Sequence, residues 1–157
     1  MTIEVYSDFT CPICVEKERM VLQALDIYPD KVKKAYHHYP SSEFGQIIAE
    51  ALEAADEQGK FWELHDRLLA DVPDDMSELE ACAAELGLDT QKFGEALDTG
   101  RFTGKVDLAK QEAISRGVKH VAVFINGREY RHSPGTLSDL CDAIDEELER
   151  DGSDDCD

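Results

Sequence analysis

Residues 2–14 of the chain read TIEVYSDFTCPIC and are its most informative stretch. Residues 2–6 are rich in β-branched side chains with alternating polarity, which predicts a strand. Residues 7–10 then form a short loop. Cys11 opens a helix, in whose first turn Pro12 is tolerated because the N–H that it lacks has no partner there. The sequence therefore places Cys11 and Cys14 at the start of a helix, directly after a strand.

Two cysteines with this spacing can carry thiol–disulfide chemistry. Their side chains lie about one helical turn apart and can close a small disulfide ring. Free backbone N–H groups and the positive end of the helix dipole favour the thiolate, which is the attacking species. We therefore predict Cys11 and Cys14 as the catalytic residues, with Cys11 as the nucleophile and Cys14 as the resolving thiol. The redox-active disulfide Cys11–Cys14 makes a separate cofactor unnecessary, and we predict neither a cofactor nor a metal.

The rest of the chain predicts further strands and helices in a recognisable order. The expected elements are a strand over 31–39, helices within about 44–100, a helix over 105–116, strands over 121–125 and 128–131, and a helix over 137–148. One of the inserted helices is expected over 77–86, with Ser77 as its N-cap. Asn126-Gly127 is a strong hairpin signal, and Pro134-Gly135 predicts a turn. The order predicts an α/β fold, a βαβ unit and a ββα unit with a helical insertion between strand 2 and strand 3.

Composition limits the number of domains and the kinds of partner. The 157 residues fit one domain over 1–150, with residues 151–157 as an acidic disordered tail. The formal net charge of −19 excludes nucleic acid and anionic membranes as partners and is typical of a protein adapted to high salt. The sequence predicts neither a membrane span nor a signal peptide, so we expect a cytoplasmic protein.

Three further cysteines lie outside the pair. Cys82 and Cys141 fall on predicted helices, where a buried small apolar residue is the expected role. Cys156 lies in the acidic tail and is expected to be exposed. An odd number of cysteines in a chain without a signal peptide argues against a framework of structural disulfides.

Several short motifs are shared with one known family. They are Asp8-Phe9-Thr10-Cys11-Pro12-Ile13-Cys14, Gln58-Gly59-Lys60-Phe61-Trp62-Glu63-Leu64-His65-Asp66 within residues 49–66, Leu86-Gly87-Leu88-Asp89, Gly117-Val118 and Phe124-Ile125-Asn126-Gly127. With these motifs the chain resembles the DsbA-like branch of the thioredoxin superfamily, up to about residue 149. The resemblance implies a thioredoxin fold with a helical insertion. It also implies a protein disulfide oxidoreductase whose partners are protein thiols and disulfides or small thiols.

The chain departs from this family at the loop before its third strand. Family members carry a proline there, opposite the dithiol, whereas this chain reads Lys119-His120-Val121-Ala122. Either Val121 or Ala122 occupies the proline position. We expect both residues, together with His120 and the dipeptide Pro12-Ile13, to contact the substrate. Asp8, Glu16 and Glu18 are acidic neighbours of the dithiol in sequence and would disfavour a thiolate if they were close in space.

Other interpretations of the same residues stay open. Cys11 and Cys14 with His120, or four thiolates across a dimer, could hold zinc or an iron–sulfur centre. A glutathione-dependent isomerase or transferase is related to this branch, although such relatives carry a serine where Cys11 stands. A redox-inert scaffold is the last alternative. The sequence leaves the substrate, the electron donor and the oligomeric state undetermined.

Overall fold

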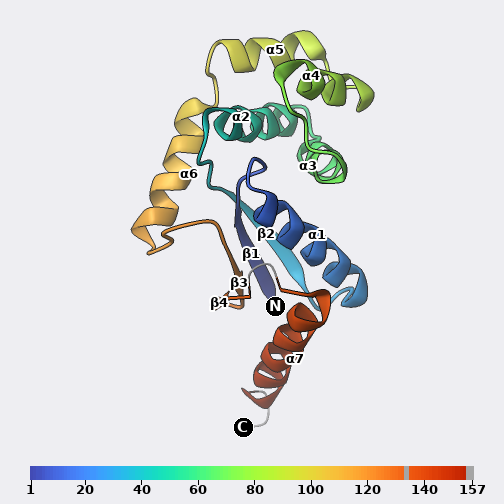
Figure 1. The fold of residues 1–157 in the computed structure, drawn as a ribbon, viewed down its shortest axis with the longest axis vertical. Coiled ribbons are helices and arrows are strands. Elements are labelled where there is room, and N and C mark those ends of the chain that lie inside the picture. The colour runs from blue at the N-terminus through green and yellow to red at the C-terminus, as the bar shows by residue number, and fades with distance from the viewer. Residues whose placement is uncertain (133–134, 155–157) are drawn as a thin grey trace. The chain divides into compact units, whose positions relative to one another are not determined.

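The computed structural model describes residues 1–132 and 135–154, so Pro134 and Cys156 lie outside the described residues. Within them the chain forms four strands and seven helices (Figure 1). In chain order these are β1 (Thr2–Ser7), α1 (Pro12–Ile27), β2 (Lys33–His38), α2 (Glu43–Glu57), α3 (Phe61–Ala70), α4 (Met76–Glu85), α5 (Thr90–Asp98), α6 (Thr103–Ser115), β3 (Ala122–Ile125), β4 (Arg128–Tyr130) and α7 (Leu137–Asp154). This order confirms the predicted α/β thioredoxin fold with helices between strand 2 and strand 3. None of the described helices is long and apolar enough to span a membrane.

The strands form one sheet in the order β2-β1-β3-β4. β1 and β4 both pair antiparallel with β3, so that Val5 lies opposite Val123, and Val123 lies opposite Tyr130. Asn126 and Gly127 have φ angles of 51° and 84°, as a two-residue turn between twisted strands requires. The predicted hairpin is therefore confirmed. It sets the register of β3 against β4, and β3 is the strand that follows the loop where the family carries its proline.

The contacts divide the chain into two compact units. The first unit, residues 1–7, 11–37 and those from 120 onward, holds the sheet with α1 and α7. Its core is built from apolar side chains of the strands and of these two helices: Ile3, Val5, Val21, Ala24, Val32, Val123, Ile125, Tyr130, Leu140 and Ile144. Burial of this cluster is the main free-energy gain that holds α1 against the sheet.

The second unit, residues 8–10 and 38–119, contains the inserted helices. The insertion runs from α2 to the end of α6 at Ser115, beyond the predicted end near residue 100. Its fully buried side chains include Leu52, Leu64 and Phe93. His38 also lies in this unit, 2.8 Å from a carboxylate oxygen of Glu53, whose other oxygen is 2.7 Å from the Lys105 ammonium.

The N-cap of α4 is Asp75, so the prediction of Ser77 was wrong. The Asp75 carboxylate accepts from the backbone N–H of Glu78 at 2.9 Å, and the Glu78 carboxylate accepts from the N–H of Asp74 at 2.7 Å. Aspartate caps a helix as well as serine does. The earlier start also gives Glu78 a backbone partner, which explains why the helix begins before Ser77.

The last helix is longer than predicted and ends at Asp154 rather than near Leu148. Arg150 pairs with Glu147 one turn earlier at 2.8 Å, and the side-chain amide of Asn126 donates to Asp151 at 3.1 Å. These contacts support four residues of the segment that was expected to form a disordered tail.

Candidate functional site

The dithiol lies at the first turn of α1. Cys11 is the N-cap residue, with extended backbone angles, and Pro12 occupies the first turn as predicted. The backbone N–H of Cys14 donates to the Cys11 sulfur at 3.4 Å. Cys11 is half-buried, whereas Cys14 is only 4% exposed. The first sulfur is therefore the one that a second molecule can reach.

A pocket of about 380 Å³ adjoins the dithiol, and all of its lining residues belong to the first unit. It brings Cys11, Ile13 and Cys14 of α1 together with the loop residues His120, Val121 and Ala122. The structure therefore brings these six residues, which the sequence analysis had singled out, together around one pocket. Pro12 is exposed in the first turn and does not line the pocket.

His120 is exposed at one edge of this pocket. Its Nδ1 lies 2.8 Å from the carbonyl oxygen of Val121, and since a carbonyl only accepts, Nδ1 carries the proton. Its Nε2 is 3.9 Å from a carboxylate oxygen of Glu129. Within the described part of the chain, no three His, Cys, Asp or Glu side chains are arranged to hold a metal ion.

Four polar residues of the pocket were not predicted: Ser7, Lys17, Glu129 and Arg131. Helical spacing could have indicated Lys17, which lies one turn beyond Ile13 and Cys14 on α1. Glu129 and Arg131 lie 3.4 Å apart at the end of the hairpin. Their position depends on the pairing of β4 with β3, which no local motif specifies.

Tyr130 forms an apolar wall of the same pocket. Its hydroxyl is buried and has no hydrogen-bond partner within the described residues. Burial raises the pKa of this phenol because it disfavours the phenolate, and the charge of Asp139 adds to the effect.

A buried ion pair lies one helical turn after Cys14 along α1. The Glu18 carboxylate on α1 pairs with the Lys34 ammonium on β2, and both side chains are almost fully buried. This ion pair joins α1, the helix that carries the dithiol, to β2. It also means that the negative charge of Glu18 is balanced by a cation.

The Asp8 carboxylate is occupied by hydrogen bonds within its own loop and with Ser41. Its carboxylate accepts from the N–H and hydroxyl of Thr10, at 2.9 and 2.7 Å, and from the N–H of Ser41 at 3.0 Å. A Cβ atom at Gly45 would lie 2.5 Å from this carboxylate, so only glycine fits there. The loop that precedes Cys11 is therefore fixed by Asp8.

The chain is similar to known proteins in sequence and in fold. A family model described as thioredoxin matches residues 1–146. The Na⁺/H⁺ antiporter NhaA 3 of Salinispora tropica is 37% identical over 153 residues, covering 92% of this chain and 22% of the antiporter. NhaA 1 of Salinispora arenicola is 34% identical over 141 residues, covering 85% and 21%. The chain thus spans about a fifth of the length of these curated relatives.

Solved structures match nearly the whole chain. A thioredoxin-like oxidoreductase from Silicibacter pomeroyi has a TM-score of 0.78 at 23% identity, covering 94% of this chain and 86% of its own. The thiol-disulfide exchange protein alpha-DsbA2 from Wolbachia pipientis has a TM-score of 0.75 at 15% identity, covering 92% and 80%. At these identities the likeness establishes a common fold.

Proposed function

The chain belongs to the thioredoxin family, and from this we propose that it is a thiol–disulfide oxidoreductase whose working dithiol is Cys11 and Cys14. One observation supports the proposal most. An accessible sulfur at a helix N-terminus faces a pocket, with a second, buried sulfur one turn away. The solved structures of similar fold include proteins described as thiol–disulfide oxidoreductases, which agrees with this chemistry.

The proposed cycle starts with attack of the Cys11 thiolate on one sulfur of a substrate disulfide. The substrate S–S bond breaks, its distal sulfur leaves as a thiolate that takes a proton, and Cys11 is joined to the substrate in a mixed disulfide. Cys14 then loses its proton and attacks the Cys11 sulfur. The Cys11–Cys14 bond forms, and the second substrate sulfur leaves as a thiol. Two electrons pass from the dithiol to the substrate, and the reverse sequence oxidises a substrate dithiol.

The environment of the two sulfurs supports this division of roles. The Cys14 N–H points at the Cys11 sulfur, where it stabilises negative charge. Burial protects Cys14 from large molecules, so it reacts with the mixed disulfide on Cys11. We assign Ile13, Val121 and Ala122 to the surface that receives the substrate chain, with His120 at its edge. Ion transport is not part of the proposal, because the match covers only about a fifth of each antiporter.

The test is a redox titration of the purified protein against a dithiol buffer at high salt, with thiols counted by mass and metal assayed in the same sample. We expect one reversible two-electron couple, with a tenfold change in the equilibrium constant for about every 30 mV. Cys11→Ser should abolish it. Cys141→Ser, which removes a half-buried cysteine of α7, is the matched control and should leave it intact. A pair that never closes, or that is isolated with bound metal, would overturn the proposal.

A further inference from the structure

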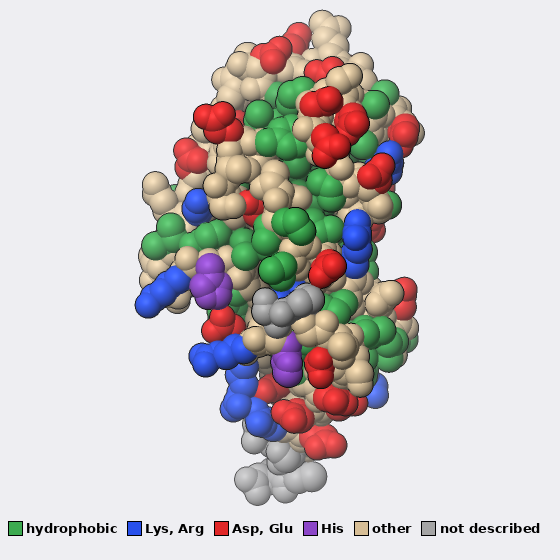
Figure 2. All heavy atoms as spheres, viewed as in Figure 1, with side chains coloured by type: hydrophobic (Ala, Val, Ile, Leu, Met, Phe, Trp, Pro, Cys, Tyr) green, Lys and Arg blue, Asp and Glu red, His purple; other side chains and the backbone are tan. Residues whose placement is uncertain are grey.

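The charges around the dithiol pocket differ from those of the chain as a whole. The chain has 35 acidic and 16 basic side chains, and Figure 2 shows acidic groups scattered over one face. The pocket instead presents the cations Lys17 and Arg131 and the imidazole of His120 against one carboxylate, that of Glu129. Although the protein has a large negative net charge, the surface around Cys11, where a substrate sulfur would bind, is locally positive.

Of these groups, Lys17 contributes the most to the positive charge of the pocket. It lies on the same helix as the dithiol, one turn beyond Ile13, and its side chain is half-buried. No ion pair or hydrogen bond joins its ammonium to another of the described residues, so its charge is not cancelled by a neighbour. Lys17 is among the residues that line the pocket, so its charge lies beside the dithiol.

Arg131 and His120 are the other basic side chains that line the pocket. Both face Glu129, at 3.4 and 3.9 Å, and both are exposed. An exposed pair of this kind is weak, so a carboxylate that enters the pocket can share the Arg131 guanidinium. Glu129 limits the positive charge of this edge without removing it.

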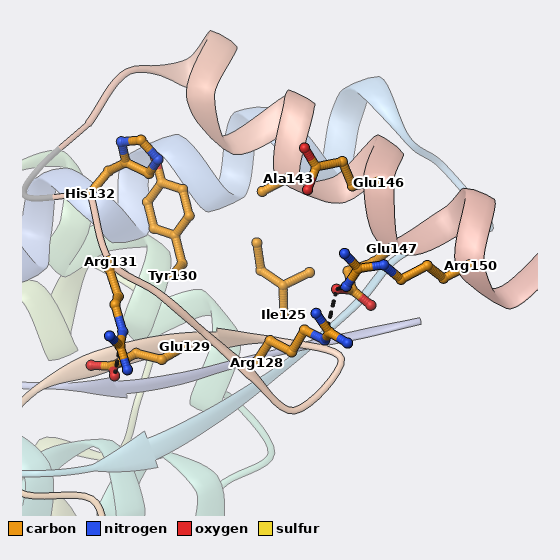
Figure 3. A pocket seen from close by; sticks show the side chains of 10 residues that line it. All are labelled: Ile125, Arg128, Glu129, Tyr130, Arg131, His132, Ala143, Glu146, Glu147 and Arg150. Atoms are coloured by element: carbon orange, nitrogen blue, oxygen red, sulfur yellow. Dashed lines mark hydrogen bonds and ion pairs between the residues drawn. The ribbon is translucent and has the colours of Figure 1, made fainter.

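A second pocket lies between β4 and α7 (Figure 3). It also measures about 380 Å³ and has more arginines. There, however, the buried Glu147 lies 3.3 Å from Arg128 and 2.8 Å from Arg150, and Figure 3 shows both guanidinium groups directed at it. This pocket shares Arg131 and Glu129 with the dithiol pocket, and Glu146 is a further carboxylate, so its three arginines face three carboxylates and it carries no excess of positive charge.

We propose that the dithiol pocket selects peptide segments that carry carboxylates beside the reacting cysteine. The inference rests on the proposed exchange function and specifies its substrate class. The carboxylate would contact Lys17 and share Arg131, while an apolar neighbour of the substrate cysteine would pack on Ile13, which is 47% exposed, and on Val121. A volume of about 380 Å³ lies in the range of pockets that bind small molecules, which is enough room for the side chains beside one cysteine.

Two short disulfide-linked peptides that differ only in Glu or Gln beside the cysteine would test the inference. The readout is the ratio of their kcat/KM values at high salt, where a screening length of about 3 Å removes repulsion by the distant carboxylates. We expect the wild type to prefer the Glu peptide roughly three- to tenfold, as contact with one or two exposed cations allows. Lys17→Gln should bring the ratio close to one, Arg131→Gln should lower it less, and Glu129→Gln should raise it.

Lys31→Gln is the matched control, because it removes the same charge from an exposed position that does not line the pocket. It should leave the ratio unchanged. A wild-type ratio of one, or equal effects of Lys17→Gln and Lys31→Gln, would overturn the inference while exchange itself stands. If neither peptide reacts, the proposed function fails as well.

Discussion

The two pockets on the first unit have similar volumes and share Glu129, Tyr130 and Arg131, yet their chemistry differs. The dithiol pocket has an accessible thiol and an uncancelled ammonium. In the pocket between β4 and α7, the guanidinium groups of Arg128 and Arg150 are held by the buried Glu147. A cavity becomes a reactive site when its polar groups are left available, and becomes part of the scaffold when they satisfy one another.

The largest effect is expected at the dithiol itself. In Cys14→Ser the mixed disulfide on Cys11 cannot be resolved, so multiple turnover should stop, with a loss of at least about a thousandfold. The covalent intermediate should accumulate and be visible as a mass increase that a reductant reverses. Cys11→Ser should not trap substrate, and trapping by that variant would reverse the assigned roles.

The buried ion pair below the dithiol should dominate stability. Glu18→Ala removes the carboxylate that pairs with the buried Lys34 ammonium, and the free energy of unfolding should fall by about 3–5 kcal/mol. Chemical denaturation measures the change. The double substitution Glu18→Leu with Lys34→Met should recover much of the loss, because it removes both charges. Equal losses for the single and double variants would contradict this explanation.

The balanced pocket should affect stability and leave exchange alone. Glu147→Gln removes the common partner of Arg128 and Arg150, which are exposed, so we expect a loss of about 1 kcal/mol. The exchange rate with a neutral peptide should equal that of the wild type. A slower rate would mean that the two pockets do not act separately.

Substitution of Tyr130, which lines both pockets, should have the smallest effect on stability at neutral pH. Tyr130→Phe removes a buried hydroxyl that has no hydrogen-bond partner among residues 1–132 and 135–154, so the free energy of unfolding should change by less than about 1 kcal/mol. The raised pKa of Tyr130 means that the unfolded chain loses its proton first as the pH rises. The stability that this group contributes is complete below a pH of about 10 and is lost above it.

Alkaline titration of stability checks this sign. The wild type should lose stability above the ordinary tyrosine pKa more steeply than Tyr130→Phe does. If the two curves are parallel, Tyr130 is not the group that titrates.

The local part of the site could be predicted from sequence, since the strand, the turn at Pro12 and the two cysteines follow one another along the chain. The hairpin was equally accessible, because Asn126-Gly127 specifies its own turn. Pairing across the sheet is not a local property, so Arg131 and Glu129 at the pocket were missed.

The expected effect of the acidic neighbours shows the same limit. Glu18 is paired with Lys34, and the Asp8 carboxylate serves Thr10 and Ser41. The charge that does line the pocket from α1 is Lys17, because helical geometry turns it toward the side of Cys14. Distance along the chain is a poor guide to which charge acts on a thiol.

The place of β1 in the sheet has a consequence for how the protein comes to fold. β1 is an inner strand whose Tyr6 pairs with Ala122, so its partner leaves the ribosome only after all five inserted helices. Each of those helices closes its backbone hydrogen bonds within four residues and can form early, whereas the sheet must wait for a distant segment of chain. During synthesis, Cys11 and Cys14 thus spend an interval on an unfinished scaffold, when a chaperone or a premature disulfide could reach both sulfurs.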